Sequence, residues 1–334
     1  MNLSNPLYFL LPADYLDKDL PDTLNGNWSQ AGGSSEGAVY STMVGLKQLG
    51  VSVKPIDTWP QQGIVIAHSR NLPKSRPSYW KRLYIVCWQI DHMRCDYAQA
   101  HIVSNTKMLA SAGLSLYDKL LLPGLRHILH FPTELSLVPR DFKRSNMFEN
   151  IVYAGAPKNL MAVFQTQEWD QMLDREGLFF RIVERSDRMG DYSQTDCILA
   201  VRPVEQQILQ KPPSKLWNAW RAGVPAILGP EPGFRDYRKS ELDYIEVETA
   251  DQALAALIKL RDNPVLRQAM IENGRQRMKD CSVETILGQW VEFINGPLQS
   301  EAQAWFQGPA WKRSLFCLAR TARMGLRKLR HSLK

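Results

Sequence analysis

The sequence predicts an α/β protein with two domains and a basic helix at its C-terminal end. The chain has 334 residues, a length that favours about two domains. Short apolar runs alternate with helical patterns in both halves, which indicates parallel sheets with helices on their faces. Residues 311–334 contain eight basic residues and no acidic one, a pattern unlike the rest of the chain.

The composition is that of a globular protein without a membrane-spanning segment. Hydrophobic residues make up 44% of the chain and charged residues 22%, which argues against general disorder. No apolar run approaches the roughly 18 residues of a spanning helix, and the run at 7–11 is too short for a signal peptide. The five cysteines are Cys87, Cys95, Cys197, Cys281 and Cys317. They are scattered and odd in number, so we expect reduced thiols and a cytoplasmic location.

The net charge of +7 is concentrated in the C-terminal segment. Outside residues 311–334 the chain has 33 basic and 34 acidic residues. The body is therefore nearly neutral, whereas a nucleic-acid-binding domain usually carries a basic face. We expect no nucleic-acid partner.

The first domain is predicted to span residues 1–131. Strands are expected at 6–11, 51–56, 64–67, 83–88, 101–103 and 119–122, and helices at 38–49 and 105–112. Gly32 and Gly33 precede the first helix, where backbone can approach a phosphate group. A flexible Gly/Ser turn explains the same pair equally well. His127 and His130 have helical spacing, but no nearby cysteine or carboxylate completes a metal site, so we interpret them as structural.

The second domain is predicted at 151–295, after a polar linker at 132–150. Strands are expected at 151–154, 178–183, 197–201, 224–228 and 244–247, and helices at 160–175, 214–222 and 250–260. Thr249 and Gln252 form a capping-box pattern at the start of the third helix. Pro264 and Ser282 mark the starts of further helices. The last segment, 296–334, is expected to be a helical, basic tail.

One segment carries a family resemblance. Residues 211–227 combine a Pro-rich loop, a short helix, and Gly223-Val224-Pro225 leading into a buried strand. The segment resembles the donor-site signature of GT-B glycosyltransferases, and Asn263-Pro264 and Asn273-Gly274-Arg275 follow in the order that this family shows. The resemblance covers about 150–290, and over 1–130 it is topological only.

The resemblance implies a GT-B fold with two Rossmann-like domains and a cleft between them. The first domain would bind a glycan or lipid-linked acceptor, and the second a nucleoside-diphosphate sugar as co-substrate. No metal and no other cofactor are expected. Two alternatives remain open: a nucleotide-sugar epimerase of the same fold, and a non-catalytic protein that binds a nucleotide sugar.

The donor-site residues that the resemblance implies lie in the second domain. They are Gly155, Lys158, Arg202, Ser214, Lys215, Leu216, Asn218 and Glu231. Ser214 and Lys215 fall at a helix N-terminus, whose free N–H groups and dipole favour an anion. Many retaining members carry two glutamates where this chain has Gln210 and Asn218, which leaves the nucleotide and the stereochemistry open. For Arg202, a salt bridge with Asp196 or Glu205 is the structural alternative.

In the first domain, Asp91 and His92 follow a strand and are the best pair for acid–base work, because histidine titrates near neutrality. A hydrogen-bonded loop histidine is the alternative interpretation. His68 follows the preceding strand and is the second candidate.

The C-terminal segment predicts a basic amphipathic helix. Leucines and alanines line one face, and the neighbouring face includes Arg320, Arg323, Arg327 and Arg330. Such a helix suits an anionic membrane surface, and we expect its deletion to leave a folded enzyme. A helix packed across the domains and an unstructured tail are the alternatives.

Overall fold

The computed structural model describes residues 5–28, 35–92, 94–109, 125–133, 135–184, 190–203 and 209–332; for Leu125, Arg323 and residues 326–332 it describes the backbone only. The chain divides into two compact units. The first unit comprises 1–26, 34–131 and 286–334, and the second comprises 27–33 and 132–285.

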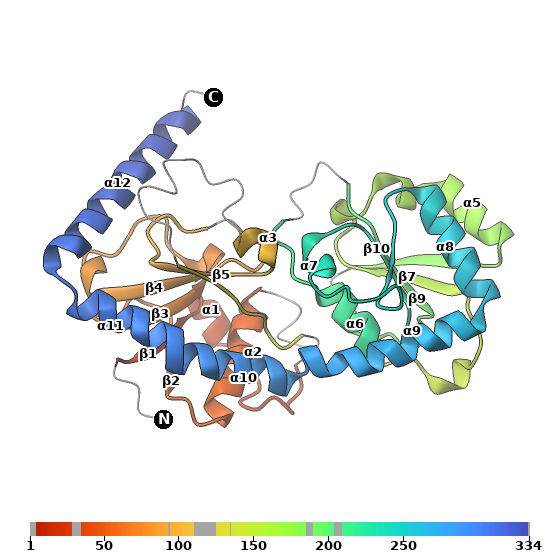
Figure 1. Cartoon of the computed structure of the whole chain (residues 1–334), viewed down its shortest axis with the longest axis horizontal. Coiled ribbons are helices and arrows are strands. Elements are labelled where there is room, and N and C mark those ends of the chain that lie inside the picture. The colour runs from red at the N-terminus through yellow and green to blue at the C-terminus, as the bar shows by residue number, and fades with distance from the viewer. Residues whose placement is uncertain are drawn as a thin grey trace. The chain divides into compact units, whose positions relative to one another are not determined.

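The first unit is built on a parallel sheet (Figure 1). Its elements are β1 (Leu7–Leu10), α1 (Ala13–Leu16), α2 (Ser35–Gln48), β2 (Val53–Ile56), β3 (Gly63–His68), β4 (Leu83–Trp88), β5 (Ala100–Val103), α3 (Thr106–Leu109) and β6 (Leu125–Ile128). Six strands pair within the described ranges, in the order β2-β1-β3-β4-β5-β6. The two central strands, β3 and β4, are buried along their whole length, as continuous apolar runs in a parallel sheet require.

The C-terminal part of the chain returns to the first unit. Its helices are α10 (Val283–Phe293), α11 (Gln299–Gln307) and α12 (Ala310–Ser332), with a π-helical turn at Ile294–Leu298. The Trp290 ring lies 4.7 Å from Trp88 and 6.2 Å from Phe9, centroid to centroid. Its indole N–H donates to the carbonyl of His130 at 2.6 Å. The predicted bounds of 151–295 and 296–334 therefore differ from the observed division, because α10 buries its aromatic face against the first sheet.

The second unit repeats the parallel-sheet architecture. Its elements are β7 (Asn150–Ala154), α5 (Gln167–Arg175), β8 (Phe179–Val183), β9 (Cys197–Ala200), α6 (Ser214–Ala222), β10 (Ala226–Leu228), α7 (Pro232–Arg235), β11 (Ile245–Glu246), α8 (Ala250–Asp262) and α9 (Pro264–Arg277). Within the described residues the strands pair in the order β11-β10-β9-β7-β8. α6 has the predicted bounds and ends at Gly223, whose φ of 71° suits a residue without Cβ. The capping box of Thr249 and Gln252 is present at the start of α8.

The predicted linker at 132–150 belongs to the second unit. Arg144 and Arg140 bind the carboxylate of Asp196 at 2.6 and 2.8 Å. The backbone N–H groups of Glu149 and Asn150 donate to the same carboxylate. Burial raises the pKa of Asp196, but these hydrogen bonds outweigh it and hold the pKa below its ordinary value. The segment is thus anchored by buried charge rather than extended.

Two local predictions need correction, and a third falls partly outside the described residues. The helix expected at 160–175 is a 3₁₀ turn at Ala162–Gln165 followed by α5, because Thr166 caps a new helix through the N–H of Trp169. The segment holding His127 is strand β6, paired in parallel with β5; the spacing with His130 is not helical. The described part of α3 ends at Leu109, so residues 110–112 of the predicted helix and the strand expected at 119–122 lie outside the described residues.

No helix in the described part of the chain combines the length and the apolar character needed to cross a membrane.

Candidate functional site

Three neighbouring strands of the second sheet end at the same edge. β7, β9 and β10 are adjacent and parallel. Gly155 follows β7, Arg202 comes two residues after β9, and Glu231 comes three residues after β10. This is the edge at which open α/β sheets bind ligands. The topology therefore brings together three of the residues predicted for the donor site.

Lys215 reaches into this edge from α6. Its ammonium donates to the carbonyl of Ala154 at 2.7 Å and lies 4.8 Å from the centroid of the Tyr153 ring. A Cβ at Gly155 would come within 3.1 Å of the same ammonium. Gly155 also has a φ of 152°, so its lack of a side chain allows both the turn and the close approach of Lys215.

Arg202 and Glu231 form a buried ion pair. The Arg202 Nε–Glu231 Oε1 distance is 2.9 Å, and Glu231 is 2% exposed. Burial raises the pKa of Glu231, while Arg202, Lys215 and Lys211 act in the opposite direction. Its second oxygen, Oε2, is buried and has no hydrogen-bond partner among the described residues. The carboxyl group thus keeps one oxygen for a hydroxyl donor such as a sugar.

The N-terminus of α6 completes a cationic surface. Pro213 precedes the helix, none of the described side chains caps it, and the first turn contains no acidic residue. Its free N–H groups and the helix dipole favour a negatively charged group beside Ser214 and Lys215. Among the described residues, Lys211, Arg202 and Lys215 outnumber the carboxylate of Glu231, so this part of the edge is suited to an anion.

The remaining predicted donor residues have different surroundings. Leu216 is fully buried in the interior, so its side chain is part of the core. Asn218 is 6% exposed, and its Oδ1 has no partner within the described ranges. Lys158 is exposed in a 3₁₀ turn at Pro157–Asn159. Arg202 does not use Asp196 as its partner, since Arg140 and Arg144 bind that residue, and Glu205 lies outside the described residues.

Tyr153 is a residue that the sequence analysis missed. It lies next to last in β7, under the ammonium of Lys215. Burial raises its pKa to about 12, so the phenol stays protonated at neutral pH. Its position near the end of a strand could have indicated a role in the site. Because it lies in a buried apolar run, the sequence analysis treated it as part of the core.

The first sheet carries a second group of polar residues at its carboxyl edge. The rings of His68 and His92 lie 5.0 Å apart in an edge-to-face arrangement. The Arg70 guanidinium lies 2.9 Å from His92 Nε2. Because an arginine can only donate, Nε2 accepts, and the proton of a neutral His92 is on Nδ1. The structure therefore brings both candidate histidines together, and Arg70 is a ring partner of His92 that fixes its tautomer.

His68 is fully buried, and neither ring nitrogen has a partner among the described residues. Burial, together with the nearby His92 and Arg70, lowers its pKa to about 3. His68 is thus neutral at physiological pH. Ile90, which leads into Asp91 and His92, has a φ of 32°, a strained value for a β-branched residue. Strain of this kind, about 1–3 kcal/mol, is concentrated at functional sites.

No group of three or more His, Cys, Asp or Glu side chains in the described part of the chain is arranged to hold a metal ion. Asp17 and Asp19 bring two carboxylates close together in the sequence, but their segment follows α1 and both residues are exposed. Nε2 of His127 lies 2.9 Å from Oε1 of Glu301, so a carboxylate does lie beside this histidine, although it comes from a distant part of the sequence. Gly32 and Gly33, the predicted phosphate loop, lie outside the described residues.

The predicted basic face of the C-terminal helix is only partly exposed. Phe316 and Cys317 of α12 are buried in the core of the first unit. Arg320 is 5% exposed and lies over the Phe316 ring at 5.1 Å. Arg320 therefore faces the body of the unit, which corrects its assignment to a membrane face. The side chains of Arg323, Arg327 and Arg330 lie outside the described residues.

The opposite face of α12 is apolar and exposed. Trp311, Leu315 and Leu318 are 63%, 58% and 68% exposed. Their spacing of four and three residues places them on one side of the helix. The prediction that leucines line one face is thus correct for this stretch, while the contact with the sheet is made by a different set of side chains.

Comparison with known proteins identifies the fold. No protein-family model and no curated protein sequence matches the chain. Among solved structures, Anabaena HepE in complex with UDP and glucose matches with a TM-score of 0.54 and 10% identity, over 87% of this chain and 100% of its own. Sucrose-phosphate synthase from Thermosynechococcus elongatus matches at 0.53 and 11%, over 89% and 100%.

AviGT4, a glycosyltransferase involved in avilamycin A biosynthesis, matches with a TM-score of 0.53 and 11% identity, over 91% of this chain and 99% of its own. This chain spans about three fifths of two longer glycosyltransferase chains, 59% of TarM and 60% of the pneumococcal O-GlcNAc transferase GtfA. The chain therefore has the GT-B glycosyltransferase fold, with two Rossmann-like units, as the motif at 211–227 predicted.

Proposed function

We propose that this GT-B chain is a glycosyltransferase that transfers a sugar from a nucleoside-diphosphate donor to a glycan or lipid-linked acceptor. The observation that carries the proposal is the cationic edge of the second sheet, where Lys215, Arg202 and the N-terminus of α6 surround Gly155. HepE, which shares the fold, is described in complex with UDP-glucose. The donor would occupy this edge.

The chemistry of the donor explains why these residues are needed. When the bond between sugar and diphosphate breaks, negative charge grows on the phosphate oxygens. Positive charge that is already in place lowers the barrier, because no reorganisation is needed during the reaction. Lys215 and the α6 N–H groups supply that charge, and Arg202 is held by Glu231. The free Oε2 of Glu231 is placed to accept a hydroxyl of the sugar or ribose.

The histidine pair of the first unit is proposed to act on the acceptor. His68 is neutral at physiological pH, and a ring nitrogen of His68 without a partner among the described residues can accept the proton of an attacking hydroxyl. In the tautomer that Arg70 fixes, Nε2 of His92 accepts from Arg70 and Nδ1 carries the proton, so within the pair of Asp91 and His92 the carboxylate of Asp91 would accept the proton. His92 and its neighbour Asp91 remain our proposed catalytic pair, with His68 as the second candidate. Arg70 holds the His92 ring in one tautomer.

We also propose peripheral contact with an anionic membrane through α12. The exposed face of Trp311, Leu315 and Leu318 would enter the interface, where tryptophan and leucine are favoured. Basic residues of the same helix would lie near the headgroups, at about 1 kcal/mol each. Phe316 and Cys317 anchor the helix to the first unit.

The test is a binding and turnover assay with UDP-, GDP-, dTDP- and CMP-sugars. Calorimetry measures donor binding, and release of the nucleotide is followed with and without glycan acceptors. Acceptor-dependent release supports transfer. Conversion of the donor with water alone favours the epimerase, and tight binding without turnover favours a non-catalytic protein. Absence of binding by every nucleotide sugar contradicts the proposal.

A further inference from the structure

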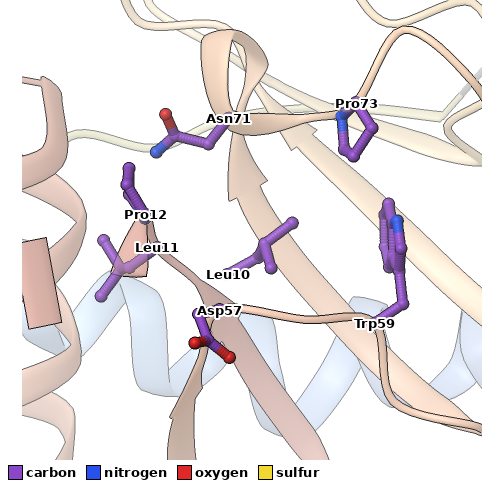
Figure 2. Close-up of a pocket in the computed structure, with 7 residues that line it drawn as sticks. All are labelled: Leu10, Leu11, Pro12, Asp57, Trp59, Asn71 and Pro73. Carbon is purple, nitrogen blue, oxygen red and sulfur yellow. The ribbon is translucent and has the colours of Figure 1, made fainter. Parts of the chain in front are cut away.

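The turns after three adjacent strands of the first sheet enclose a small pocket. It has a volume of about 260 Å³. Figure 2 shows Leu10 in its middle, with Trp59 and Pro73 on one side and Leu11 and Pro12 on the other. The polar members of the lining are Asp57 and Asn71. Because β2, β1 and β3 are neighbours, the pocket lies at the carboxyl edge of the sheet, where parallel sheets bind ligands.

The lining combines the groups that recognise a sugar ring. Trp59 is partly buried against the core, and its carbonyl accepts a hydrogen bond from the Tyr79 hydroxyl at 3.0 Å. Its indole offers a fixed apolar surface for the C–H face of a pyranose. Asp57 is exposed, and an ionised carboxylate accepts hydrogen bonds from hydroxyl groups strongly.

Asn71 adds a polar group at the other wall of the pocket. Its amide Nδ2 is buried and has no partner in the described part of the chain. A buried donor without a partner is unfavourable, so a ligand acceptor that satisfies it would be favoured. Asn71 belongs to a 3₁₀ turn at Ser69–Asn71. The same turn carries Arg70 to His92, which connects the pocket to the histidine pair.

Size and charge exclude the donor as the occupant. Pockets for drug-sized ligands measure about 300–1,000 Å³, so this one suits a single ring rather than a nucleotide sugar. Among the described residues, the lining contains one carboxylate and no basic residue, which disfavours a diphosphate. We propose that this pocket binds one pyranose ring of the acceptor, an assignment that rests on the proposed glycosyl transfer and specifies its acceptor as a carbohydrate at this position.

The experiment uses the full chain and a panel of neutral and amino-sugar glycosides without nucleotide. Saturation-transfer NMR titrations measure sugar binding to the wild type, Asp57→Asn and Trp59→Leu. Asp14→Asn is the matched control, since Asp14 is also exposed near the end of β1 but does not line the pocket. Far-UV circular dichroism and thermal unfolding establish that each variant is folded.

We expect at least one glycoside to bind, and Asp57→Asn and Trp59→Leu each to weaken its binding at least tenfold, with the control unchanged. Equal binding by all four proteins overturns the proposal, as does the absence of binding by the whole panel at millimolar concentration. Donor binding is measured by calorimetry on the same samples. Its absence in the wild type contradicts the proposed function alone, because the sugar titration reports on the pocket separately.

Discussion

At the scale of single residues, the proposed donor site at the edge of the second sheet depends on a charged group that is in direct contact with its neighbours. The Lys215 ammonium is held by the Ala154 carbonyl and the Tyr153 ring, so its position is set before any ligand arrives. Gly155 makes room for it. Preorganised charge of this kind binds an anion without paying for the ordering of a long side chain.

Lys215→Ala should weaken nucleoside-diphosphate binding about 10- to 100-fold, because a hydrogen bond to a charged group contributes about 1.5–3 kcal/mol and 1.4 kcal/mol is a factor of ten. Isothermal titration calorimetry with UDP measures this, or with whichever nucleotide the panel identifies. Lys239→Ala is the control, since Lys239 is 68% exposed and pairs with Asp280 away from the site. Equal affinity in the Lys215 variant and the wild type would remove Lys215 from the donor site.

At the scale of elements, α12 has two faces with different roles. Phe316 lies 5.8 Å from the ring of Trp80 and 5.1 Å from that of Trp305, and Lys81 donates to Ser314 at 2.9 Å. These contacts fix the helix on the first unit. We therefore no longer expect the enzyme to fold without residues 311–334, because truncation would remove part of the core of the first unit.

Two kinds of substitution in α12 should separate packing from membrane contact. Leu315→Ser with Leu318→Ser should leave thermal stability nearly unchanged, because both side chains are exposed, but should reduce co-sedimentation with anionic vesicles.

Phe316→Ala should lower the free energy of unfolding by about 3 kcal/mol, as for other buried aromatic truncations. Salt should weaken vesicle binding of the wild type only in part, since screening leaves the apolar contribution intact.

The double variant is compared with the wild type on anionic and neutral vesicles of the same size. If both proteins pellet equally with anionic vesicles, the exposed face of α12 is not a membrane contact. A double variant that melts well below the wild type would instead indicate that these leucines are part of the fold.

At the scale of the whole molecule, the first unit contains three buried histidines that resist protonation. Burial lowers the pKa of His68 and of His101 to about 3, and that of His130 to about 4. In the unfolded chain the same groups titrate near 6.5. Between these values the unfolded state binds more protons than the folded state, so stability is complete above about pH 6.5 and falls as the pH drops towards 4.

The melting temperature of the first unit should therefore decrease between pH 6.5 and pH 4.5, and His130→Gln should show a smaller decrease than the wild type. Differential scanning calorimetry across this range measures it. Hydrogen bonds hold the pKa values of the buried carboxylates Asp196 and Asp243 below the ordinary value, so the stability that these groups contribute is present throughout this range and is lost only at lower pH. A melting temperature that is constant from pH 6.5 to pH 4.5 would contradict the prediction.

The sequence by itself determined the features whose signals are local. The bounds of α6, the stop at Gly223 and the capping box of Thr249 and Gln252 each depend on residues within one helical turn. The continuous apolar runs of β3 and β4 predict central parallel strands, because a strand in the middle of such a sheet is buried on both faces. The order of these elements, with the motif at 211–227, was enough to predict the GT-B fold.

Only the tertiary structure decided which residues meet across long stretches of sequence. Arg70 contacts His92, and Asp196 binds both Arg140 and Arg144. Trp290 packs against Trp88 of the first unit. On α12, helical periodicity predicted an apolar face but did not identify the face that packs against the first unit. Phe316, rather than the exposed leucines, makes that contact, because its ring lies against Trp80 and Trp305. Spacing along the chain fixes which side chains share a face, whereas their partners depend on how distant elements pack, and that information is not contained in any local pattern.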